Sequence, residues 1–254
     1  MKEGTEADPW AIGWLVRGLV LVTFLAAFAV PVGLVPIVAI ATDASGELTP
    51  AESVIVIQLG TPVPTATPTP EFTPTPHVPR IGIIAGHSGS DVGAMCPDGL
   101  TEVEINLAVA ERVVRLLAGY GWQVHQLEEF DVRLNGYQAD ALLSIHADSC
   151  NVPGKTGFKV ARAEASYIPH PEDRFVECLR HHYGSITGLP FDQDTITYDM
   201  TRYHAFYEIN PNTPAAIIEA GFMLDDRALL TEHPDVVANG IVAGLVCFIE
   251  GESR

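Results

Sequence analysis

Hydrophobic residues are spread very unevenly along this chain of 254 residues, and their distribution predicts its organisation. Residues 18–42 form an apolar run without a charged residue, which is longer than the roughly 20 residues needed to cross a bilayer. Residues 60–79 are instead dominated by Thr-Pro pairs, which cannot form a helix or a sheet because proline removes donors and fixes φ. Beyond residue 80, short apolar runs alternate with amphipathic stretches, as in an α/β domain. We therefore expect an N-terminal tail (1–17), a transmembrane helix (18–42), a Thr/Pro-rich linker (43–79) and a globular domain (80–254).

The charges around the apolar run predict its orientation. Lys2 and Arg17 precede the run, whereas acidic residues follow it, beginning with Asp43, so the positive-inside rule places the tail in the cytoplasm. This predicts a single-pass membrane protein with an extracytoplasmic globular domain, held at a distance on the order of 60 Å by a linker in polyproline II. The alternative is a cleavable signal peptide, because the sequence Ala-Ile-Ala that ends at Ala41 resembles a cleavage site. Cleavage near Ala41 would give a secreted protein.

The globular domain begins with a short apolar run at residues 81–85, which is typical of a parallel strand covered on both faces. A helix is then predicted from Thr101, because Thr101 and Glu104 match a capping box, to about Gly119. Further strands are expected at residues 122–127, 141–146, 157–161 and 214–219, and further helices at 175–187 and 234–249. This alternation indicates an α/β fold.

The predicted helix has one apolar face. Its expected buried stripe consists of residues at helical spacing, and extending this stripe back by one turn reaches Glu102. We therefore expect Glu102 to point toward the sheet, whereas Glu104 faces another side of the helix and serves the cap. The stripe comprises Ile105, Val109, Val113 and Leu116.

Three of the predicted strands end in ionisable residues. His87, His146 and Glu219 each follow or end an apolar run, and Glu102 points toward the same edge. Because ligands bind at the carboxyl ends of parallel strands, we expect these four side chains to lie together. Two imidazoles and one carboxylate form a familiar zinc set with an open position for water, and a second carboxylate can accept the proton of that water. The pattern therefore predicts metal-assisted hydrolysis.

Charge and cysteine content narrow the possibilities further. The net charge of −18 argues against nucleic-acid binding, which needs clustered lysine and arginine. The four cysteines contain no CxxC pair, and in an exported domain they permit two disulfides. We expect one between Cys96 and Cys150, because both follow motifs that converge on the predicted metal site, and a second between Cys178 and Cys247.

Four separated motifs stand out in the globular domain: Gly-His-Ser-Gly-Ser-Asp-Val-Gly-Ala at 86–94, Gly-Leu-Thr-Glu at 99–102 followed by Asn-Leu at 106–107, Ala-Asp-Ala-Leu-Leu-Ser-Ile-His-Ala-Asp at 139–148, and Pro-Ala-Ala-Ile-Ile-Glu-Ala-Gly-Phe at 214–222. Together they resemble the zinc-dependent N-acetylmuramoyl-L-alanine amidases of bacterial cell-wall turnover. The resemblance covers about residues 81–249. It implies a catalytic domain with a twisted, mostly parallel sheet flanked by helices, Zn²⁺ held by His87, Glu102 and His146, and Glu219 as the catalytic carboxylate. The implied reaction is cleavage of the amide between N-acetylmuramic acid and L-alanine in peptidoglycan.

Some residues depart from the family pattern. Ser88 replaces a usual glycine, and Asp148 stands where asparagine is common. Asp91 and Asp148 are candidates for orienting the imidazoles. The alternative functions are a zinc-dependent peptidase acting on peptide stems and a catalytically inactive cell-wall-binding module. The remaining histidines lack a strand-end context and are expected to be solvent-facing or structural, among them His125, His170, His181, His182, His204 and His233.

Overall fold

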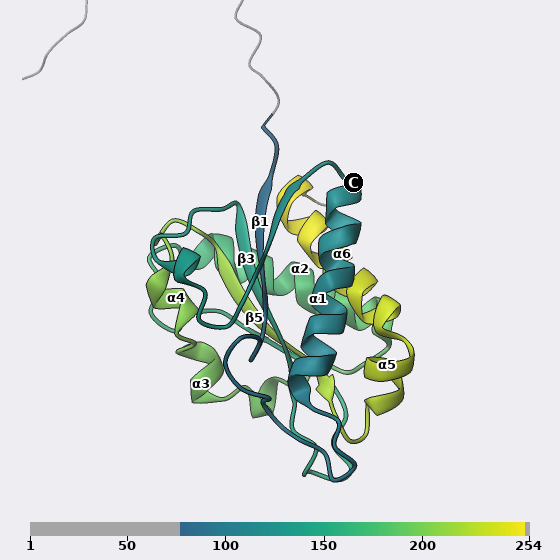
Figure 1. Cartoon of the computed structure of the whole chain (residues 1–254). Helices are drawn as coiled ribbons and strands as arrows, with labels where there is room; N and C mark the ends of the chain where they lie inside the picture. The colour runs from purple at the N-terminus through teal and green to yellow at the C-terminus, as the bar shows by residue number, and fades with distance from the viewer. Residues whose placement is uncertain (1–76, 252–254) are drawn as a thin grey trace, which may run out of the picture. The chain divides into compact units, whose positions relative to one another are not determined.

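The computed structural model describes residues 77–251, which fold around one five-stranded sheet (Figure 1). The strand order is β2-β1-β3-β5-β4. The first four strands in this order run parallel, and β4 is antiparallel to β5. The mostly parallel α/β sheet expected from the sequence is therefore present. The strands are β1 (Arg80–Ala85), β2 (Gln123–Leu127), β3 (Ala141–Asp148), β4 (Lys159–Ala161) and β5 (Ala215–Phe222).

Helices cover both faces of the sheet, but unequally. One face is covered by α1, α2 and α6, and the other by the short helices α3 and α4 (Figure 1). Alternation along β1 supplies both cores, since Ile81 and Ile83 belong to the first and Ile84 to the second. The helices are α1 (Glu102–Gly119), α2 (Pro169–Thr187), α3 (Tyr198–Thr201), α4 (Ala205–Glu208), α5 (Arg227–Glu232) and α6 (Pro234–Glu250), with 3-10 turns at Val132–Leu134 and Gln193–Thr195.

Helix α1 begins where the capping box predicted. The backbone N–H and the hydroxyl of Thr101 both donate to the Glu104 carboxylate, at 2.9 and 2.8 Å. The end of the predicted buried stripe is wrong, because Leu116 is 37% exposed whereas Leu117 is fully buried. A step of four residues from Val113, rather than three, keeps the stripe over the sheet at this point, because 3.6 residues make a turn.

Helix α2 begins earlier than residue 175, where the sequence analysis placed its start. Its first residue is Pro169, whose fixed φ suits the first helical turn. The short helices α3, α4 and α5 were not predicted, because segments of four to six residues are too short to show a helical pattern of apolar residues.

Two disulfides cross-link this fold. Cys96, in the loop before α1, is bonded to Cys150, just after β3, with Cα atoms 5.2 Å apart. Cys178 in α2 is bonded to Cys247 in α6, with Cα atoms 5.8 Å apart. These are the two pairings expected from the sequence. The first ties together two loops at the carboxyl edge of the sheet, and the second ties two helices on one of its faces.

Residues 77–251 include no helix that is both long and apolar enough to cross a membrane. The predicted tail at 1–17, the predicted transmembrane helix at 18–42 and the linker as far as residue 76 lie outside the described residues.

Candidate metal centre

His87 lies in a tight turn at the carboxyl end of β1. It has a left-handed backbone conformation, with φ of 67°, which is uncommon outside glycine. The turn is held by Ser88, whose backbone N–H donates to the carbonyl of Ala85 at 3.1 Å. The ring of His87 is fixed on one side by Asp91, since its Nδ1 lies 2.6 Å from the Asp91 carboxylate. Asp91 thus contacts this imidazole, as expected of a residue that orients a metal ligand.

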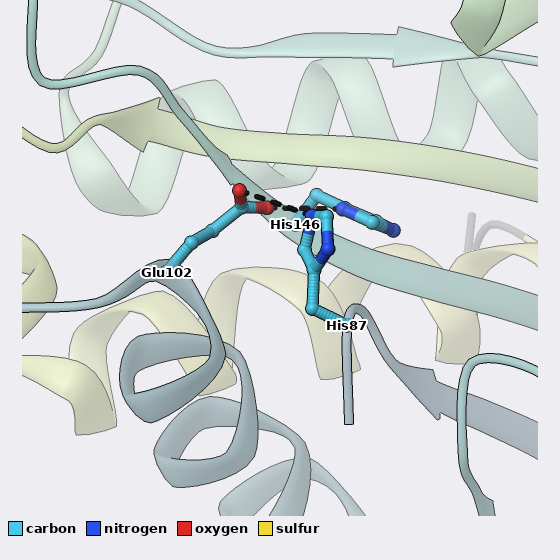
Figure 2. Close-up of side chains that lie close together, drawn as sticks. All are labelled: His87, Glu102 and His146. Carbon is cyan, nitrogen blue, oxygen red and sulfur yellow. Dashed lines mark hydrogen bonds and ion pairs between the residues drawn. The ribbon is translucent and has the colours of Figure 1, made fainter. Parts of the chain in front are cut away.

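Glu102, the first residue of α1, connects the two histidines (Figure 2). Its Oε2 lies 3.1 Å from His87 Nε2, and its Oε1 lies 3.0 Å from His146 Nδ1. The carboxylate is only 6% exposed and also accepts hydrogen bonds from the backbone N–H of Ala94 and from the amide of Asn106. Helical periodicity thus placed Glu102 correctly at the sheet edge.

The side chains of His87, Glu102 and His146 form a group that could hold a metal ion. One donor atom from each lies within 4.8 Å of the others. Two ring nitrogens and one carboxylate oxygen are donors that suit a borderline divalent cation such as zinc. In the metal-free protein, the hydrogen bond to Glu102 raises the pKa of His87 to about 9. A bound cation would compete with protons for these donor atoms.

Two glycines allow the chain to pass close to these side chains. A Cβ at Gly93 would lie 2.5 Å from Glu102 Oε2 and 2.7 Å from His87 Cδ2. A Cβ at Gly86 would clash with the ring of His146. Because real Cβ atoms do not approach so closely, both positions require glycine as long as the three side chains keep this arrangement.

Glu219 lies next to the group on the neighbouring strand. It is in register with His146 in the parallel β3–β5 pair, so the two side chains emerge on the same face. Its Oε2 is buried and makes no hydrogen bond within the protein. Burial raises the pKa of Glu219 to about 7, and the nearby carboxylate of Glu102 contributes in the same direction. A carboxyl group with such a pKa can exchange a proton near neutral pH.

Asp148 does not contact either imidazole, which corrects the role suggested for it. It pairs instead with the buried ammonium of Lys159 on β4. The register of β3 against β5 shifts between His146 and Asp148, and β4 brings Lys159 opposite Glu219. A lysine that is 4% exposed needs a nearby anion, and Asp148 supplies it.

Two further residues at the site were not identified from the sequence. Glu129 accepts a hydrogen bond from the backbone N–H of His87 at 2.7 Å and lies 3.6 Å from His146 Nε2. His204, which was expected to be solvent-facing or structural, lies 3.0 Å from the other oxygen of Glu129. The position of Glu129 just after β2 was a usable signal, because it repeats the pattern of an ionisable residue beyond a strand's carboxyl end. No comparable signal marks His204, which comes from the segment between α3 and α4.

The chain is similar to several known amidases. Over 137 residues it is 28% identical to the N-acetylmuramoyl-L-alanine amidase AmiC of Neisseria meningitidis, a match that covers 49% of this chain and 33% of that protein. The chain thus matches about a third of the length of this curated relative. A solved N-acetylmuramyl-L-alanine amidase from Mycobacterium smegmatis superimposes with a TM-score of 0.56 at 20% identity, covering 68% of this chain and 97% of the other. A solved N-acetylmuramoyl-L-alanine amidase of Nostoc punctiforme gives a TM-score of 0.51 at 25% identity, covering 67% and 97%. Residues 81–247 match the family model described as N-acetylmuramoyl-L-alanine amidase, and the chain therefore belongs to this family.

Proposed function

We propose that this protein is a zinc-dependent peptidoglycan hydrolase that cleaves the amide between N-acetylmuramic acid and L-alanine. The observation that carries the proposal is the placement of the unpaired Glu219 carboxylate beside the His87–Glu102–His146 group, within a domain of the amidase family. Family membership supports the choice of substrate, and the donor set supports the choice of metal.

The three proposed ligands would leave one coordination position of a zinc ion open. Three protein ligands are typical of catalytic zinc sites, in which a fourth position stays open, whereas structural sites are closed by four. A Zn²⁺ ion held here supplies a Lewis acid next to the carbonyl to be attacked. His87, Glu102 and His146 would hold that ion through one atom each.

Glu219 is suited to move the proton. In its ionised form it accepts a proton from the attacking water, and in its protonated form it donates a proton to the departing amine of L-alanine. Both roles need a carboxyl group that can exchange a proton near the working pH, and before any cation binds, burial raises the pKa of Glu219 to about 7. Oε2 of this side chain is buried and makes no hydrogen bond within the protein, so no internal partner competes for its proton.

Two variants test these assignments separately. Glu219→Gln should retain zinc and lose about 10²–10⁴ of the rate, which is the typical effect of losing a general base. His146→Ala should lose both zinc and activity. Bound zinc is measured by elemental analysis, and activity by mass spectrometry of the fragments released from peptidoglycan. Near-normal release by Glu219→Gln would contradict the proposed mechanism.

The digest also identifies the reaction. An amidase frees an intact peptide stem that begins with an unblocked L-alanine. Shortened stems would indicate a zinc peptidase instead, and the absence of any cleavage by the zinc-loaded protein would indicate a binding module.

We also propose that the amidase domain is anchored outside the cytoplasmic membrane. The support is the uncharged run at residues 18–42, with Arg17 at its amino end and Asp43 after it, followed by the Thr/Pro-rich linker. Protease added to intact spheroplasts should then release the domain. Recovery of the domain in the medium with a new N-terminus near Thr42 would replace the anchor with a cleaved signal peptide.

A further inference from the structure

Glu129 lies close to both proposed histidine ligands. It comes just after β2, and its side chain is 8% exposed. One oxygen, Oε2, accepts a hydrogen bond from the backbone N–H of His87 at 2.7 Å and lies 3.6 Å from Nε2 of His146. Its other oxygen lies 3.0 Å from His204 Nε2. A single carboxylate therefore touches both ligands and a third imidazole.

The two nitrogens of His146 have different surroundings. Nδ1 faces Glu102 at 3.0 Å, which places it on the side of the proposed metal, and the second nitrogen points away from Glu102 (Figure 2). That second nitrogen, Nε2, is buried and has no hydrogen-bond partner. Histidines that bind a metal usually donate their other ring N–H to a carboxylate, which fixes the orientation of the ring. Glu129, 3.6 Å away, is placed to accept this hydrogen bond once the ring turns slightly toward it.

His87 depends on Glu129 in a different way. Its own ring is already held by Asp91, but its backbone has the left-handed conformation that a histidine adopts only at a cost. The hydrogen bond from the His87 N–H to Glu129 holds this conformation. Asp91 thus fixes the ring of His87, whereas Glu129 fixes its backbone.

We propose that Glu129, itself held by His204, is a positioning residue that orients both histidine ligands of the metal centre. This inference rests on the proposed zinc site and extends it to a second layer of residues. His204 belongs to the segment that joins α3 to α4, and its Nδ1 lies 2.9 Å from Glu208 in α4. A chain of contacts therefore runs from α4 through His204 and Glu129 to the metal ligands.

The test is the zinc affinity of the full-length protein, measured by competition with a chelator. Glu129→Gln keeps the size of the side chain but replaces one acceptor oxygen with a donor, so we expect zinc to bind about 10–100-fold more weakly. Glu128→Gln is the matched control, because Glu128 is the adjacent, exposed glutamate, and its affinity should equal that of the wild type. His204→Ala should weaken zinc binding less than Glu129→Gln does, because it removes only the partner of Glu129.

A second readout separates positioning from a loss of folding. The absorption spectrum of the Co²⁺-substituted protein reports the geometry of the ligands, and we expect it to change in Glu129→Gln but not in Glu128→Gln. Zinc affinity and a Co²⁺ spectrum equal to those of the wild type in Glu129→Gln would overturn the inference. Failure of the wild-type protein itself to bind zinc would instead overturn the proposed function.

Discussion

The carboxyl edge of the sheet and the interface between α2 and α6 are both buried and both cross-linked by a disulfide, yet they differ in the chemistry of their side chains. The edge gathers ionisable side chains such as Glu102, His146 and Glu219. The helix interface is apolar, with Phe175 stacked on Phe248 at a centroid distance of 4.6 Å. At the edge the Cys96–Cys150 disulfide joins two loops, whereas Cys178–Cys247 joins the two helices.

The contrast suggests that the helix interface mainly contributes to stability and the sheet edge mainly to function. Apolar burial between α2 and α6 stabilises the fold at any pH and without a metal. The group at the edge buries charges and leaves Oε2 of Glu219 unpaired, which costs free energy until a cation and substrate are present. Changes at the helix interface should therefore alter the stability of the protein, and changes at the edge should alter its metal binding and chemistry.

Removing each disulfide tests this separation with the largest expected effect. Cys178 and Cys247 are 69 residues apart and Cys96 and Cys150 are 54 apart, so opening either loop should cost about 4 kcal/mol of unfolding free energy. Only the double variant Cys96→Ser/Cys150→Ser should also weaken zinc binding, because Cys96 follows Ala94, whose N–H donates to Glu102. Urea denaturation and chelator competition measure the two quantities. Equal zinc affinity in both double variants would remove the distinction between the two regions.

A single substitution at a glycine between α2 and α6 tests the same comparison with a smaller expected effect. A Cβ at Gly244 in α6 would lie 2.9 Å from the Cα of Leu179 in α2, so Gly244→Ala should destabilise the protein by about 1–3 kcal/mol through overpacking. Zinc affinity should not change. Gly119→Ala is the control, because this helical glycine has nothing within 4 Å of the added Cβ and should be neutral or stabilising by up to about 1 kcal/mol. Thermal unfolding measures the stability of both variants, and an equal effect of the two substitutions would contradict this prediction.

The third test concerns the pH dependence of stability. The pKa of Glu219 is about 7 in the folded, metal-free protein against a usual value of 4.5, so the folded state binds this proton more tightly than the unfolded state does. Its ionisation therefore lowers stability progressively as the pH rises from 4.5 to 7. Glu219→Gln should thus stabilise the protein at pH 8 by up to about 3 kcal/mol and have little effect near pH 4. An equal effect of the substitution at both pH values, in chelator-treated protein, would contradict this account.

The sequence predicted the parts of the fold that local patterns specify. Apolar runs marked the five strands, and helical spacing placed Glu102 at the sheet edge. Spacing alone did not distinguish Leu116 from Leu117, because both fit a helix to within one residue and only packing against the sheet selects one. The start of α2 at Pro169 was missed because its first turn is mostly polar.

The parts of the site that were missed depend on contacts between distant segments. Asp148 was expected to orient an imidazole, but β4 places the ammonium of Lys159 beside it. His204 reaches the site only because its segment packs over the second face of the sheet, where Glu129 meets it. Neither the Asp148–Lys159 pair nor the His204–Glu129 pair can be predicted from local composition or periodicity.

The pairing of β3 with β5 has a consequence for how the protein matures. Leu142 of β3 is in register with Ala215 of β5, so the two strands are separated by more than seventy residues of the chain. All of these residues must be synthesised before the strands can pair. Such non-local pairing forms slowly, because the entropy of closing the loop is lost before the contacts are gained. Glu219 reaches its place beside His146 only after this step, and His204 arrives with the same late segment. A newly synthesised chain would therefore pass through partly folded states in which these side chains are not yet together, and hydrolytic activity would begin only when folding is finished.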